Sequence, residues 1–439
     1  MKQGFWDMSR YRDLLRSSQL STLEGKISRI TGMMIEAIGL ECSIGDVCEI
    51  HIGGESGTVL SEVVGIADKV TYLMPYQEVE GIGYACAVTC RGEKLTIKVS
   101  DELTGRTINA LGIPIDDGPE ITGGVPVSIG GTPGNPLDRP PISEVMEIGV
   151  KAIDGLLTIG KGQRIGIFAG SGVGKSTLMG MIARNVRADI NVIALVGERG
   201  REVVEFIERD LGPEGKKRSV LVVATSDQPA LMRLKCAQTA TAIAEYHQKQ
   251  GKHVLLMMDS LTRFAMAQRD IGLNSGEAPV ARGYTPSIYS ALPKLLERAG
   301  NFKKGSITGI YTVLVEGDDT NEPIADTVRG IIDGHIILSR KIASKNHYPA
   351  IDVLNSVSRL MSGIASPEHK EAANKLRKML AILRDNEDLI SIGAYEPGNS
   401  PELDDAVAHR ERLDSFLTQA TEASFSFDET LQLLKQAVQ

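Results

Sequence analysis

The chain has 439 residues, of which 42% are hydrophobic and 24% charged, and its formal net charge at pH 7 is -8. This length and composition predict a folded protein of about two or three domains and exclude an intrinsically disordered chain. The acidic balance supplies no general basic field, which disfavours a surface devoted to nucleic-acid binding.

The cysteines and the N-terminal sequence indicate a reducing compartment. The 5 cysteines are odd in number and form no CxxC pair, so we expect reduced thiols in the core and neither a disulfide framework nor a metal site. The first residues, MKQGFWDMSRYRDLL, carry charges where a signal peptide would be apolar, and no apolar run reaches the ~18 residues of a membrane span. We therefore expect a cytoplasmic protein.

Residues 1–20 are predicted to form a short N-terminal helix. The apolar residues near one helical face, surrounded by Arg10, Arg12 and Arg16, are Trp6, Tyr11, Leu14 and Leu15. Such a mixed face favours an interaction site, and packing of the helix on its own neighbouring domain is the alternative.

Residues 21–99 are predicted to form a β-barrel domain. Glycines and polar turns interrupt short β-rich segments about every 8 to 12 residues, the spacing of a small antiparallel barrel or sandwich. These segments are KISRI, VCEIHI, GTVLSEVVGI, KVTYLM and YACAVTC. Residues 100–145 follow as a linker and wrapping segment, because the part from 123 to 144 is dense in Gly and Pro.

Residues 146–364 are predicted to form a central α/β domain with a mainly parallel sheet. Apolar runs alternate with helix-length segments, as expected of parallel strands covered by helices on both faces. The runs are RIGIFAG, INVIALVG, SVLVVATS, HVLLMMDS, ITGIYTVLVEG and GHIILSR. Residues 365–439 are predicted to be a C-terminal helical domain, since 367–390 and 404–423 carry apolar residues at helical spacing.

The stretch FAGSGVGKSTL (168–178) joins an apolar strand to the start of a helix. Backbone N–H groups of such a glycine loop converge on phosphate oxygens, because glycine permits the tight turn and the helix start has unpaired donors. Lys175 would reach the β- and γ-phosphates and Ser176 would ligate Mg²⁺. Ala169 stands where the strict pattern has glycine, which is tolerated while its φ stays negative. A glycine turn unrelated to nucleotides is the alternative.

Two further apolar strands end in charged residues. Asp259 ends HVLLMMD and would hold Mg²⁺ beside the loop, although a strand-end aspartate is also a common helix N-cap. Glu198 and Arg199 end NVIALVGER, where a carboxylate can orient the attacking water and an arginine can bind the phosphoryl group. A surface ion pair explains these two residues equally well.

Several long motifs resemble the ATPases of type III protein export, above all the flagellar export ATPases, which are similar to the catalytic subunit of rotary ATP synthases. The resemblance covers nearly the whole chain. The motifs are AGSGVGKST, VGERGRE, LLMMDSLTRFAMAQRDIGLNSGEAP, ARGYTPSIYSALPKLLERAG, EGDDTNEPIADTVRGIIDGHIILSR and YPAIDVLNSVSRLM.

The resemblance implies a RecA-like P-loop ATPase domain that binds ATP and Mg²⁺. It assigns catalytic roles to Lys175, Glu198, Arg199 and Arg359, the last as an arginine finger that serves the neighbouring subunit of a ring. Tyr348 would stack on adenine, and Ser176 and Asp259 would lie on the Mg²⁺ side. The phosphate loop would consist of Gly170, Ser171, Gly172, Val173, Gly174, Lys175, Ser176 and Thr177.

The resemblance also implies partners and a location. It predicts a homohexamer that binds a dimeric regulator through the N-terminal segment. The other partners would be the export gate and stalk proteins, export substrates and their chaperones, with no nucleic acid. The expected location is the cytoplasm, peripherally on the inner face of the cell membrane at the export apparatus.

Other functions share parts of this pattern. A non-catalytic subunit of a rotary synthase would lack the carboxylate at Glu198, and a Rho-like nucleic-acid translocase would carry basic and aromatic residues in its N-terminal domain. The catalytic subunit of a rotary synthase is a closer alternative, against which stand GDDTNEPIADTVRG and the short C-terminal domain. A virulence (injectisome) secretion ATPase is the nearest alternative to a flagellar one.

Overall fold

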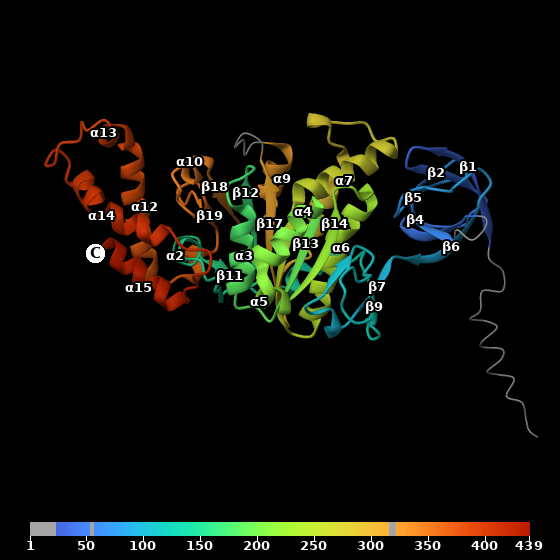
Figure 1. The fold of residues 1–439 in the computed structure, drawn as a ribbon, viewed down its shortest axis with the longest axis horizontal. Coiled ribbons are helices and arrows are strands. Elements are labelled where there is room, and N and C mark those ends of the chain that lie inside the picture. The colour runs from blue at the N-terminus through green and yellow to red at the C-terminus, as the bar shows by residue number, and fades with distance from the viewer. Residues whose placement is uncertain (1–22, 53–56, 316–321) are drawn as a thin grey trace, which may run out of the picture. The chain divides into compact units, whose positions relative to one another are not determined.

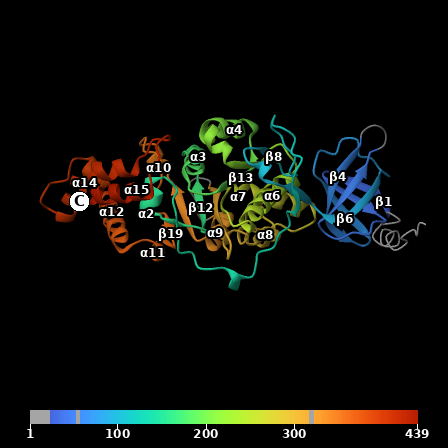
Figure 2. The same cartoon turned by 90° about the horizontal axis from the view of Figure 1, so that it is seen from below.

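The computed structural model of the protein describes residues 23–52, 57–315 and 322–439 (Figures 1 and 2). The predicted interaction helix at residues 1–20 lies outside this part. Contacts divide the chain into two compact units. One contains the chain up to Leu95 together with Asn274–Gly276, and the other contains the remainder.

The first unit contains a closed antiparallel barrel in the order β1-β2-β5-β4-β3-β6, with β6 pairing back onto β1. Alternating apolar residues such as Ile35, Ile50 and Leu73 point into the barrel and are fully buried. The prediction of a barrel is therefore confirmed, although it missed β2. The strands are β1 (Glu24–Thr31), β2 (Met34–Ile38), β3 (Asp46–His51), β4 (Thr58–Ala67), β5 (Val70–Pro75) and β6 (Ala87–Lys94).

Within the described residues, the second unit contains a nine-stranded sheet in the order β19-β18-β12-β17-β15-β13-β14-β8, with β16 paired to β17. The strands from β18 to β8 run parallel, and β19 is antiparallel at one edge. The strands are β8 (Thr107–Asn109), β12 (Arg164–Ala169), β13 (Ile190–Glu198), β14 (Ser219–Thr225), β15 (His253–Asp259), β16 (Gly300–Asn301), β17 (Ser306–Leu314), β18 (Gly334–Leu338) and β19 (Val357–Ser358). The predicted parallel sheet is confirmed.

Residues 100–145, which the sequence predicts to be a linker and wrapping segment, contain strands. β8 adds a parallel strand at the edge of the sheet, and β9 (Val125–Ser128) pairs with β7 (Thr96–Val99). Thr96–Val99 thus lies outside the barrel, unlike in the sequence analysis. The wrapping part is held by Arg139, whose guanidinium donates to the carbonyls of Glu297 and Ala299.

Helices cover both faces of the sheet. The α6 helix packs on β13, β14 and β15, and α9 packs on β12 and β17. The apolar face of α3 joins Ile165, Ile167 and Ile193 in one core. The helices are α3 (Lys175–Asn185), α4 (Gly200–Glu205), α5 (Gly212–Lys217), α6 (Ala230–Lys249), α7 (Leu261–Asn274), α8 (Pro286–Leu296), α9 (Pro323–Ile331), α10 (Arg340–Ala343) and α11 (Met361–Ile364), with a π-helical turn at Phe206–Leu211.

The C-terminal part of the second unit is helical, as predicted. Helices α12, α14 and α15 pack on one another and on α2 (Figure 1). The second predicted helix, 404–423, ends earlier, at Leu417, because Thr418 adopts an extended backbone. The helices are α2 (Lys151–Leu156), α12 (Pro367–Asp385), α13 (Glu387–Ser391), α14 (Pro401–Leu417) and α15 (Phe427–Val438), and β10 (Val145–Met146) pairs with β11 (Ile159–Gly160) nearby.

The 5 cysteines form no disulfide; Cys48 and Cys236 are buried and the other three are half-buried. In the described part of the chain, no helix is both long and apolar enough to cross a membrane. The domain limits expected from the sequence stay predictions.

Candidate active site

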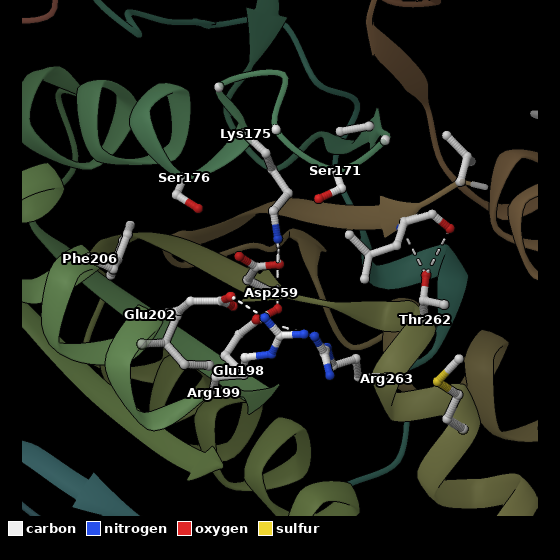
Figure 3. A pocket seen from close by; sticks show the side chains of 18 of the residues that line it. Ser171, Lys175, Ser176, Glu198, Arg199, Glu202, Phe206, Asp259, Thr262 and Arg263 are labelled. Atoms are coloured by element: carbon white, nitrogen blue, oxygen red, sulfur yellow. Dashed lines mark hydrogen bonds and ion pairs between the residues drawn. The ribbon is translucent and has the colours of Figure 1, made fainter. Parts of the chain in front are cut away.

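A cavity of about 820 Å³ lies where the strands β12, β13 and β15 end. Most of the residues singled out from the sequence line it (Figure 3). They are Gly170, Ser171, Gly172, Gly174, Lys175, Ser176, Thr177, Glu198, Arg199 and Asp259. Parallel strands bring these distant segments together because their carboxyl ends share one edge of the sheet.

The glycine loop joins β12 to α3 with the backbone that the sequence required. Gly172 and Gly174 have φ angles of 77° and 87°, a left-handed region that glycine adopts without strain. A Cβ at Gly172 would meet no described atom within 4 Å, so the loop leaves open space beside this residue. Ala169 ends β12 fully buried, and Val173 points into the core. The loop therefore forms a cradle at the start of α3.

Lys175 projects from the first turn of α3 between two carboxylates (Figure 3). Its Nζ forms a short ion pair with Asp259 Oδ1 and lies 3.7 Å from Glu198 Oε1. Asp259 is 4% exposed and also accepts a hydrogen bond from Thr312 Oγ1 at 2.7 Å. The two acids that the sequence placed at strand ends thus converge on the lysine of the loop.

Glu198 has the chemistry of a poised base. It is 7% exposed, and its Oε1 has no hydrogen-bond partner among the described residues. Burial, assisted by the charge of Asp259, raises the pKa of Glu198 to about 7, although Lys175 and Arg263 favour the ionised form. A carboxyl that titrates near neutral pH is suited to accepting a proton there.

The other loop and strand-end residues differ in exposure. Ser176 is half-buried on the cavity wall, and Thr177 Oγ1 lies 3.5 Å from Asp210 Oδ1. Arg199 is exposed, and its guanidinium lies 3.5 Å from Glu202 Oε1. Arg199 is therefore free to reach a group in the cavity at the cost of a weak surface contact.

Tyr348 does not line the cavity, but it lies against the phosphate loop. A Cβ built on Gly174 would be 3.5 Å from two carbons of the Tyr348 ring. The residue is 41% exposed, so part of it remains accessible.

Arg359 lies near the amino ends of the strands, whereas its own phosphate loop lies at their carboxyl ends. Its N–H donates to Asp333 O, next to the amino end of β18, whereas the loop follows the carboxyl end of β12. Five residues of strand separate those two levels, about 16 Å at 3.3 Å per residue. The structure therefore does not bring Arg359 into its own cavity.

Arg263 is a cavity residue that was not predicted from the sequence. Its Nη2 lies 3.4 Å from Glu198 Oε2, and its side chain lines the cavity from α7. The signal was its place four residues after Asp259, one helical turn into the element that follows the strand.

The residues present fit a magnesium-bound nucleoside triphosphate. The loop offers backbone donors, Lys175 offers a cation, and the buried Oε1 of Glu198, which accepts no hydrogen bond among the described residues, points to a ligand that completes the site. Ser176 and Asp259 supply the hydroxyl and carboxylate oxygens that Mg²⁺ prefers.

This fold and site define a P-loop ATPase domain. Residues 149–358 match the ATP synthase alpha/beta family, nucleotide-binding domain, and residues 365–436 match the type III secretion EscN ATPase C-terminal domain. The chain belongs to the family of flagellum-specific ATP synthases and type 3 secretion system ATPases, and it is an ATP hydrolase.

The similarity to these relatives extends over nearly the whole chain. The chain is 57% identical to the flagellum-specific ATP synthase of Bacillus subtilis (strain 168) over 411 residues, 93% of this chain and 94% of the relative. It is 48% identical to the type 3 secretion system ATPase of Xanthomonas euvesicatoria over 412 residues, 93% of each. Assembled EscN of enteropathogenic E. coli, solved in complex with its central stalk EscO, has a TM-score of 0.88 and 47% identity, covering 94% of this chain and 100% of that one.

Proposed function

We propose that this chain is the ATPase of a flagellar type III export apparatus, and that it hydrolyses Mg²⁺-bound ATP as a homohexameric ring. The observation that carries the proposal is the convergence of Lys175, Glu198 and Asp259 in the cavity beside the glycine loop. The export-type C-terminal region supports it against a rotary synthase subunit.

The loop and its lysine bind the phosphates. The N–H groups of Gly170–Gly174 and the start of α3 hold the phosphate oxygens, and Lys175 exchanges its carboxylate partners for the β- and γ-phosphates. When bound beside Ser176 and Asp259, Mg²⁺ supplies positive charge that neutralises the phosphate oxygens.

Glu198 prepares the water. Its Oε1, which accepts no hydrogen bond among the described residues, accepts a proton of the attacking water, whose oxygen bonds to the γ-phosphorus while the bond to the bridging oxygen of ADP breaks. Arg199 and Arg263 lie near enough to stabilise the charge of the transferring phosphoryl group. The products are ADP and inorganic phosphate.

Tyr348 contacts the base of the nucleotide. An exposed ring next to the first turn of α3 offers adenine a stacking surface beside the phosphate site.

Arg359 acts on a neighbouring subunit. Its distance from its own cavity supports an arginine finger supplied in trans, so each active site forms between two chains. The assembled state of the EscN relative supports a ring of such interfaces.

The flagellar assignment rests on the identity of 57% to the Bacillus subtilis relative, against 48% to the Xanthomonas euvesicatoria type 3 secretion ATPase, although the flagellum-specific ATP synthase of Salmonella typhimurium is 46% identical. The virulence system remains the second candidate. A stalk partner is proposed from the EscN complex with EscO. From the family resemblance come the dimeric regulator at residues 1–20, the gate, the substrates with their chaperones, and the location at the inner face of the membrane.

Mixing two inactive variants tests the shared active site. Lys175→Ala lacks the lysine that binds the phosphates but keeps the arginine finger. Arg359→Ala keeps the phosphate site but lacks the arginine finger. Each should lose about 10³-fold or more in ATP hydrolysis. Combined at equal amounts before assembly, they should restore about one competent interface in four.

The assay is phosphate release at matched ring concentration, with each variant alone as the control. Mixed rings that contain both variants and stay as inactive as either parent would show that Arg359 does not act in trans.

A further inference from the structure

The connection between α14 and α15, residues 418–426, runs alongside the helix that carries the phosphate loop. The backbone N–H of Gln419 donates to Tyr348 O at 3.0 Å, and the Tyr348 ring lies beside Gly174 at the start of α3. At the other end of α3, Arg184 Nη2 donates to Thr421 O at 2.6 Å. This connection, which belongs to the C-terminal helical region, is therefore bonded directly to the end of the phosphate-loop helix and linked through Tyr348 to its start.

The side chain of Gln419 anchors the connection. Its Oε1 accepts from Lys151 N at 2.9 Å, and its Nε2 donates to Gly149 O and to Ala423 O, each at 2.9 Å. The residue is 8% exposed. The backbone groups around the amide fix which end is oxygen and which is nitrogen, because Lys151 N–H can only donate and the two carbonyls can only accept.

These contacts make Gln419 the junction of three chain segments. Its side chain is bonded to the start of α2, its backbone to the segment of Tyr348, and it lies just beyond Leu417, where α14 ends. A buried amide that makes three hydrogen bonds resists displacement, because any shift leaves several polar groups unpaired.

We propose that Gln419 is a positioning residue for the nucleotide site: it holds the Tyr348 segment against the phosphate loop, so that binding of the base depends on the seating of the C-terminal helices. This inference rests on the proposed contact between Tyr348 and the base. It adds a physical link by which a partner that moves α14 alters nucleotide affinity.

The substitution Gln419→Glu tests the link with almost no change of shape. A carboxylate oxygen replaces Nε2 and faces the carbonyls of Gly149 and Ala423, so the junction becomes repulsive. Binding of the non-hydrolysable nucleotide AMP-PNP and of inorganic tripolyphosphate, each with Mg²⁺, is measured by calorimetry. We expect the Kd of AMP-PNP to rise about threefold to tenfold and that of tripolyphosphate, which has no base, to stay within about twofold.

A double-mutant cycle with Tyr348→Ala separates positioning from general support. In the Tyr348→Ala background, Gln419→Glu should cause no further loss of AMP-PNP affinity, because the group being positioned is gone. Gln432→Glu, the same change at an exposed site on α15, is the matched control. Gln419→Met, which removes the hydrogen bonds without adding charge, serves as a second variant if Gln419→Glu does not fold.

The outcomes are distinct. Equal losses for AMP-PNP and tripolyphosphate, or additive losses in the double variant, would overturn the positioning role while leaving the contact of Tyr348 with the base intact. If Tyr348→Ala alone leaves AMP-PNP affinity unchanged, the base contact itself is wrong, and the role of Gln419 fails with it.

Discussion

The ion pair between Arg263 and Glu198 contributes to the pH at which the proposed base becomes ionised, after burial, Asp259 and Lys175. The pKa of Glu198 is raised to about 7 by burial and by Asp259, and Arg263 opposes this rise. Replacing Arg263 with Met removes a positive charge that favours the carboxylate. The pKa of Glu198 should then rise further, and the acid limb of the activity profile should move to higher pH.

The geometry gives the size of the shift. The two groups are 3.4 Å apart, and the Arg263 side chain is 28% exposed. Because the Arg263 side chain reaches water and contributes less to the pKa of Glu198 than Lys175 does, the dielectric constant of water, about 80, is appropriate, which gives an interaction of about 1 kcal/mol. This corresponds to a shift of about one pH unit.

The assay is kcat/KM for ATP hydrolysis between pH 5.5 and 9, which reports the ionisation of the free enzyme. Arg263→Lys keeps the positive charge. The acid limb of its pH profile should therefore stay near the wild-type position even if kcat/KM falls. Titration of ATP itself is the same for every variant and cancels in the comparison. An acid limb that stays in place in Arg263→Met, or moves to lower pH, would refute the assignment of Glu198 as the titrating base.

Two further predictions concern the stability of the folded protein, the first from packing in α3 and α9 and the second from the burial of His247. Gly180→Ala in α3 should destabilise the protein by about 1 to 3 kcal/mol in urea unfolding, because the new Cβ would lie 2.3 Å from Asp210 O. Gly330→Ala in α9 has no described atom within 4 Å of its Cβ and should instead stabilise slightly; equal effects would contradict this packing argument. Burial, with help from Lys252, lowers the pKa of His247 to about 4. The unfolded chain therefore binds this proton first, and stability is lost as the pH falls from the unfolded value near 6.5 towards 4. Between pH 7.5 and 5 the loss should be about 2 kcal/mol larger in the native protein than in His247→Gln, and parallel curves would show that His247 does not titrate in this way.

Local sequence predicted much of the phosphate site. The glycines, Lys175 and Ser176 are close together in the chain. The residue types themselves indicate the tight turn of a phosphate loop, because glycine adopts its backbone angles without strain. The strands that end in Glu198 and Asp259 were visible as apolar runs, since a strand buried on both faces has few polar residues. The roles of these residues in hydrolysis stay predictions until the variants are measured.

Elements without a strong local pattern escaped the sequence analysis. β8 lies in a stretch that reads as a linker, and it is a strand because β14 offers an unpaired edge. The early end of α14 at Leu417 has a similar cause, because the side chain of Gln419 bonds to residues 149 and 151 instead of facing solvent on a further helical turn.

The sequence by itself determined the class of each region, the phosphate loop and the positions of the charged strand ends, because those features depend on neighbours along the chain. Only the tertiary structure decided which charges meet. Arg263 pairs with Glu198, and Gln419 joins Tyr348 to α2, across separations of 65 to 268 residues. Such contacts depend on the order of strands in the sheet and on the packing of helices, and no periodicity within one segment encodes them.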